Sequence, residues 1–69
     1  MNILEERLIN HLQEIRWQKG WSQAQLSRIS GIPQSTINAI ENNERIPSVL
    51  IALKLAHALS VKVEDIFTL

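Results

Sequence analysis

Apolar residues recur at helical spacing in five successive stretches of this chain. In the first stretch they stand three or four positions apart, with charged residues between them: Leu4, Leu8, Leu12 and Ile15. This spacing places the apolar side chains on one face and predicts an amphipathic helix from about residue 3 to Lys19. Gly20 ends the predicted helix, because glycine readily takes the left-handed conformation that often follows a last turn.

The second and third helices are short, and a tight turn at Gly31 separates them. Ser22 and Gln25 have the spacing of a capping box, so the second helix should begin at Ser22. Its inward-facing residues are expected to be Leu26 and Ile29.

The third helix should start near Pro33, since proline is tolerated in a first turn. Ile37 and Ile40 are expected to face the bundle. Asn42 and Asn43 should stop this helix, because asparagine is the usual substitute for glycine in a left-handed cap.

A fourth helix is expected after Pro47, with Ser48 as its cap. Its predicted buried stripe is Val49, Ala52, Leu53, Ala56 and Leu59. A shorter fifth helix should cover residues 63–67. Together these patterns predict one all-α domain over residues 1–69, built as a compact bundle of five helices.

The segment from Ser22 to Glu41 has the layout of a helix-turn-helix. The expected third helix opens with the polar triplet Gln34, Ser35 and Thr36, while isoleucines close its other face. In such a unit one helix braces the next, which enters the DNA major groove. The sequence therefore predicts sequence-specific binding to double-stranded DNA.

Composition narrows the alternatives. The chain has 69 residues, of which 45% are hydrophobic, and it contains no cysteine. Disulfides and thiolate metal sites are therefore excluded, and a reducing cytoplasm is the expected location. The first ten residues carry acids where a signal peptide would be apolar. No stretch reaches the roughly 20 apolar residues of a membrane span, so no membrane association is expected.

The balance of charge is an objection to DNA binding. Seven basic and seven acidic residues give a formal net charge of zero, whereas phosphate contact is driven by Lys and Arg. The position of the charges matters more than their sum, however, and helix N-termini and neutral polar side chains also bind phosphate oxygens. We therefore expect weak non-specific binding, with specificity resting on base contacts and dimerisation.

Three segments carry a resemblance to a known family: LQEIRWQKGWSQAQLS, GIPQSTINAIENNERIPS and LKLAHALSVKVEDIF. They span Leu12 to Phe67, and the chain resembles the lambda-repressor and Cro family of helix-turn-helix domains, also called XRE-like. The resemblance implies a lambda-repressor-like bundle with helix 3 as the recognition helix, usually in a dimer on a palindromic operator. The chain departs from the family pattern at Pro33, Asn43, Glu44 and Ser60, and Glu44 matters most, because an acid near the DNA backbone weakens binding.

Three residues of the third helix are candidates for base contact. The Gln34 amide is suited to bond adenine through N6 and N7, and Asn38 would read adenine one turn further along. Ser35 would contact either a base or a phosphate. The alternative for all three is an exposed polar face without a partner.

Four further residues are candidates for phosphate contact: Gln23, Thr36, Asn42 and Arg45. The role of Gln23 is implied by the resemblance, with the positive end of the second helix as its physical basis. The resemblance also implies that Arg16 and Glu41 form a structural ion pair. This pair would hold the recognition helix against the first helix.

Apolar residues that fall outside the predicted core suggest a subunit interface: Leu50, Ile66, Phe67 and Leu69. Packing inside the monomer is the competing explanation. His11 and His57 lie on different helices without clustered carboxylates, and no catalytic motif is present. We therefore expect no metal, no cofactor and no enzymatic activity.

The function predicted from these observations is transcriptional regulation by a homodimer. Its simplest form is repression by occupying a promoter, since we expect no effector domain beyond residue 69. Activation through contact with polymerase is a second form of the same function. A protein of a different class is the alternative: an antitoxin-like interaction module with secondary DNA binding. Zero net charge and the apolar terminal residues favour that alternative.

Overall fold

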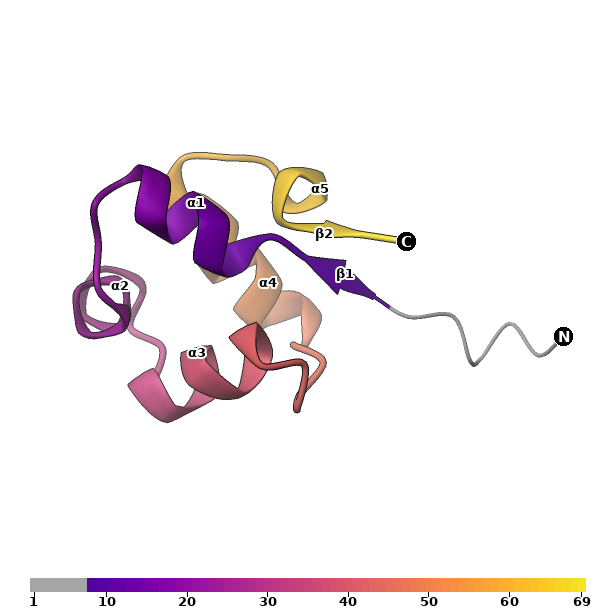
Figure 1. Cartoon of the computed structure of the whole chain (residues 1–69), viewed down its shortest axis with the longest axis horizontal. Coiled ribbons are helices and arrows are strands. Elements are labelled where there is room, and N and C mark those ends of the chain that lie inside the picture. Colours follow the sequence, from indigo (N-terminus) through magenta and orange to yellow (C-terminus); the bar gives the residue numbers. More distant parts are fainter. Residues whose placement is uncertain (1–7) are drawn as a thin grey trace, which may run out of the picture.

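The computed structural model describes residues 8–69, which form five helices and one small sheet. The helices are α1 (Leu12–Gln18), α2 (Gln23–Ser30), α3 (Gln34–Glu41), α4 (Val49–Leu59) and α5 (Val63–Ile66). The strands are β1 (Ile9–Asn10) and β2 (Phe67–Thr68). The predicted five-helix fold is confirmed, and Figure 1 shows the strands side by side at one end of it.

The helices enclose a core of aliphatic side chains and one aromatic ring. Its members are Leu12, Leu26, Ile32, Ile37, Ile40, Ala52, Leu55, Ala56, Leu59, Ile66 and Phe67. Each fully buried Leu or Ile contributes about 1.5–3 kcal/mol of transfer free energy. Every helix supplies at least one of these residues, so the core fixes the position of α3 from several sides.

The first helix begins later than predicted. Residues 8–11 are not helical, and Ile9–Asn10 instead pairs antiparallel with Phe67–Thr68. The His11 N–H also donates to the Ile66 carbonyl at 2.7 Å. The prediction was wrong here because these partners come from the other end of the chain, which local periodicity does not detect. The first part of the predicted helix, residues 3–7, lies outside the described residues.

The predicted helix ends are confirmed where the signal is local. The Ser22 hydroxyl accepts from the Gln25 N–H at 3.1 Å, and the Gln25 side chain accepts from the Ser22 N–H at 2.7 Å. The Ser48 hydroxyl caps α4 by accepting from the Ile51 N–H at 3.1 Å. Gly31 and Asn43 have φ of 76° and 59°, which is the left-handed conformation expected after α2 and α3.

The predicted inner faces of α2 and α4 need correction. Ile29 is exposed, and Ile32 beyond the turn fills the core in its place. In α4 the buried residues are Ala52, Leu55, Ala56 and Leu59, whereas Val49 and Leu53 are exposed. Because α4 is apolar at almost every position, its sequence pattern does not distinguish the two faces.

Two residues expected at a subunit interface belong to this core instead. Ile66 is fully buried, and Phe67 is 9% exposed. They close the core beside β1. This is the packing inside the monomer that the sequence offered as the alternative to a subunit interface. Leu50 and Leu69 are exposed. Within residues 8–69, none of the helices is both long and apolar enough to cross a membrane.

Candidate nucleic-acid interface

The turn between α2 and α3 is held by hydrogen bonds from the end of α2 to the backbone of Gly31 and Ile32. The Gly31 N–H donates to the Ser27 carbonyl at 2.9 Å. The Ser27 hydroxyl donates to the Ile32 carbonyl at 2.6 Å, and the Ser30 hydroxyl accepts from the Ile32 N–H at 3.2 Å. These hydrogen bonds hold Ile32 in the core and fix the turn that sets the angle between the two helices.

Helix α3 presents a polar outer face and an apolar inner face. Ile37 and Ile40 are buried, whereas Gln34, Ser35 and Asn38 are exposed. The three candidate base readers therefore lie on the same accessible surface. Thr36 is only 9% exposed, so its hydroxyl offers little surface to a phosphate.

A bidentate ion pair fastens the end of α3 to α1. Arg16 Nε donates to Glu41 Oε2 at 2.8 Å, and Arg16 Nη2 donates to Glu41 Oε1 at 3.0 Å. Arg16 Nη1 donates to the Trp21 carbonyl at 2.8 Å. The side chains of Arg16 and Glu41 are 7% and 1% exposed. Hydrogen bonding to Glu41 raises the pKa of Arg16 above its ordinary value, although burial opposes this shift.

Gln23, the first residue of α2, is bonded to α3 through both ends of its amide. Its Nε2 donates to Glu41 Oε1 at 3.0 Å, and its Oε1 accepts from Asn38 Nδ2 at 3.4 Å. Asn38 Oδ1 in turn accepts from Asn42 Nδ2 at 3.0 Å. A candidate phosphate ligand, a candidate base reader and the structural ion pair are thus joined in one chain of hydrogen bonds.

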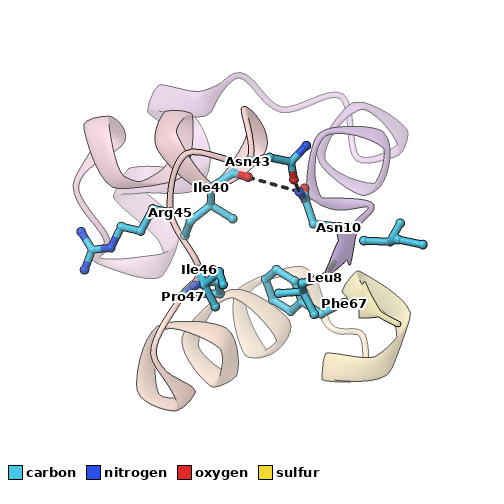
Figure 2. A pocket seen from close by; sticks show the side chains of 9 residues that line it. Leu8, Asn10, Ile40, Asn43, Arg45, Ile46, Pro47 and Phe67 are labelled. Carbon is cyan, nitrogen blue, oxygen red and sulfur yellow. Dashed lines mark hydrogen bonds between the residues drawn. The ribbon is translucent and has the colours of Figure 1, made fainter. Parts of the chain in front are cut away.

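The segment after α3 supplies an exposed cation next to an exposed acid, Arg45 and Glu44. It borders an open groove of about 470 Å³ beside the sheet, lined by Leu8, Ile9, Asn10, Ile40, Asn43, Arg45, Ile46, Pro47 and Phe67. Figure 2 shows the Arg45 guanidinium pointing away from the other lining side chains. It is therefore free to meet a ligand outside the groove.

Sequence reasoning missed Asn10 as a contributor to this region. Asn10 Nδ2 donates to the Ile40 carbonyl at 3.2 Å and to Asn43 Oδ1 at 2.7 Å, as Figure 2 shows. These bonds connect β1 to the C-terminal end of α3. Local sequence patterns could not have predicted these bonds, because the partners lie 30 and 33 positions away along the chain. The sequence had also assigned Asn10 to the first helix.

The chain belongs to the helix-turn-helix family, whose model matches residues 12–66. This confirms the XRE-like resemblance, and it places the chain among DNA-binding transcriptional regulators. No group of acidic residues and histidines within residues 8–69 has the arrangement of a metal site.

Two curated relatives and one solved structure illustrate this membership. The chain is 42% identical over 60 residues to the uncharacterized HTH-type transcriptional regulator YgzD of Bacillus subtilis, covering 87% of this chain and 91% of YgzD. It is 33% identical to the antitoxin HipB of Escherichia coli, covering 80% of this chain and 62% of HipB. The restriction-modification controller protein C.AhdI of Aeromonas hydrophila superposes with a TM-score of 0.75 at 37% identity, covering 78% of this chain and 82% of that one.

Proposed function

We propose that this protein is a sequence-specific DNA-binding repressor that acts as a homodimer on a palindromic operator. The observation that carries the proposal is the exposed polar face of α3 on a helix whose other face is locked into the core. The Arg16–Glu41 pair adds a second anchor at the end of that helix. A rigid helix with a polar outer face is the element that direct reading of the major groove requires.

Base reading is assigned to Gln34, Asn38 and Ser35. Gln34 is exposed in the first turn of α3, the part of a recognition helix that reaches base edges in this class of domain. Its amide is matched to adenine N6 and N7, and Asn38 lies one turn further on. Ser35 contributes a hydroxyl to either a base or a neighbouring phosphate.

Phosphate contact is assigned to Gln23, Asn42 and Arg45. Gln23 lies at the N-terminus of α2, where the helix dipole favours an anion. Asn42 and Arg45 are exposed beyond the end of α3. Thr36, a candidate on sequence grounds, is left out because it is buried.

The second subunit is proposed to cover the exposed apolar residues around the start of α4: Ile46, Val49, Leu50 and Leu53. Such a surface favours association between copies. Two copies of α3 would then enter successive major grooves about 34 Å apart. Occupation of a promoter by this dimer represses transcription without a cofactor, a metal or catalysis, and it takes place in the cytoplasm.

Selection of bound sites from a random duplex library, at near-physiological salt, tests the proposal. We expect an enriched two-fold palindrome with half-sites about one helical turn apart. Gln34→Ala should relax preference at one position of each half-site and cost about 1–3 kcal/mol. The control Arg45→Ala should weaken all sequences alike and reduce the salt slope by about 1. A uniform loss with Gln34→Ala would contradict the assignment of base reading, and no enrichment by the wild type would contradict the function.

The relative HipB favours a second candidate, an antitoxin-like module whose main partner is a protein. The exposed apolar side chains of α4 would then receive that partner instead of a second copy. Salt-insensitive association with a co-purifying protein, together with no selected DNA site, would favour this candidate. Affinity for generic duplex that falls steeply with salt would favour the DNA reader.

A further inference from the structure

Four side chains from α2, α3 and the residue after α3 form a continuous series of hydrogen bonds from the protein interior to the surface. We name this series the amide relay: Glu41, Gln23, Asn38 and Asn42. Its inner end is a carboxylate with 1% side-chain exposure, and its outer residues are exposed. The relay therefore connects a fixed buried group with residues that face a ligand.

The chemistry of Glu41 gives the relay a single direction. An ionised carboxylate only accepts hydrogen bonds, so Gln23 must present its Nε2 to Glu41. The Gln23 oxygen then faces α3, and Asn38 must present its Nδ2 to that oxygen. This leaves the Asn38 oxygen to accept from Asn42 Nδ2, which is the arrangement observed.

We propose that Glu41, acting through Gln23, is a positioning residue that sets which way the Asn38 amide faces when Asn38 reads a base. This inference rests on the proposed DNA-reading function. Asn38 retains one N–H and one oxygen lone pair outside the relay. Adenine presents an acceptor at N7 and a donor at N6, so a bidentate contact requires the asparagine nitrogen and oxygen in one order. If the Asn38 amide is reversed, its nitrogen and oxygen exchange places and no longer match adenine N7 and N6.

Asn42→Asp tests the relay from its exposed end without touching the buried pair. Aspartate only accepts, so Asn38 would have to turn Nδ2 toward residue 42 and its oxygen toward the Gln23 oxygen. Because Glu41 prevents Gln23 from turning, the two demands conflict. We expect the preference for adenine at the position read by Asn38 to fall about tenfold, within the discrimination given by one bidentate contact.

Asn43→Asp is the matched control. It adds the same charge one residue further along, and its carboxylate still accepts from Asn10 Nδ2. Aspartate also tolerates the left-handed conformation of residue 43. Both variants should therefore lose general affinity for DNA, and Asn42→Asp should lose more because Asn42 is also a proposed phosphate contact. Only Asn42→Asp should change base preference.

Site selection and side-chain amide NMR of the DNA-free protein together separate the outcomes. The relay predicts that Asn42→Asp shifts the Gln23 and Asn38 side-chain NH₂ resonances, whereas Asn43→Asp leaves them in place. If the wild type selects a site and the two variants keep the same base preference, the positioning role is overturned and the proposed function stands. If the wild type selects no site, the proposed function fails, and the base-reading role of Asn38 fails with it. The NMR shifts would then show only whether the hydrogen bonds of the relay exist.

Discussion

Arg16 shows how one charged residue organises the recognition unit. Its guanidinium makes three hydrogen bonds, two to the Glu41 carboxylate and one to the Trp21 carbonyl. The pair is buried, so its charges are not screened by water as an exposed pair would be. Arg16 thus links α1, the segment before α2 and the end of α3.

Removing one partner of this pair should be costly. In Arg16→Met, Glu41 would be left buried with Gln23 as its remaining bonded neighbour, and the Trp21 carbonyl would lose its donor. We expect the free energy of unfolding to fall by about 3–5 kcal/mol, measured by urea denaturation. This is a large fraction of the total stability of a domain of this size.

The double variant Arg16→Met with Glu41→Leu is the control for that experiment. Replacing both charges with apolar side chains removes the unpaired carboxylate, so most of the lost stability should return. An equal loss in the single and double variants would mean that packing, and not the buried charge, causes the effect.

The sequence predicted the exposure of the three candidate base readers of α3 correctly. Gln34, Ser35 and Asn38 are exposed together because α3 has the expected register. The relay could not be predicted, because it depends on α2 and α3 meeting in space, and Glu41 was paired in sequence only with Arg16. The burial of Thr36 was missed because it belongs to the polar triplet at the start of α3, whose other two members, Gln34 and Ser35, are exposed.

At the scale of elements, helix α4 ends with an unusual residue. Ser60 takes the left-handed conformation, with φ of 57° and ψ of 41°, and its N–H bonds the carbonyls of Ala56 and His57. For a residue with a Cβ atom, this conformation costs about 1–2 kcal/mol. Glycine avoids that cost but loses more backbone entropy on folding, by about 0.5–1 kcal/mol.

Ser60→Gly should therefore stabilise the protein by about 0.5–1 kcal/mol, seen as a higher urea midpoint with an unchanged slope. Ser60→Ala is the matched control, because it removes the hydroxyl and keeps the Cβ atom. A similar gain in both variants would assign the effect to the hydroxyl instead of the backbone conformation.

Element boundaries divide into those that local chemistry sets and those that distant contacts set. The capping box at Ser22 and the left-handed Gly31 were predictable, since each acts within a few residues. The start of α1 was not, because β1 pairs with β2 from the opposite end of the chain. The inner face of α4 was also missed, since apolar residues on both faces give no contrast.

At the scale of the whole molecule, that second apolar face of α4 needs an explanation. Val49 is 77% exposed, Leu50 62% and Leu53 54%, and Ile46 just before the helix is 77% exposed. Isolated exposed apolar residues are ordinary, but four in one short segment make a patch suited to association. A two-fold interface would bury each of these residues twice, once from each copy.

Leu50→Glu tests whether this patch joins two copies. The substitution places a charge in the first turn of α4, where the helix dipole favours an acid, so the monomer should remain folded. Because both copies lose an apolar contact, and Leu50 is 62% exposed in the monomer, association should weaken by about 2–4 kcal/mol, twice that share of the value of one buried leucine. Sedimentation velocity over a concentration series should show dimers for the wild type and monomers for the variant.

Trp17→Glu provides the comparison, since Trp17 is 61% exposed and belongs to α1, outside the segment that carries the patch. It should leave the dimer intact. If only Trp17→Glu loses the dimer, the interface lies on α1. If the wild type stays monomeric both free and on its selected DNA, the homodimer is overturned.

DNA binding gives a second measurement. We expect Leu50→Glu to keep its affinity for a single half-site and to lose cooperative binding to paired half-sites. That result would show that the patch joins two recognition helices, each of which makes its base contacts independently.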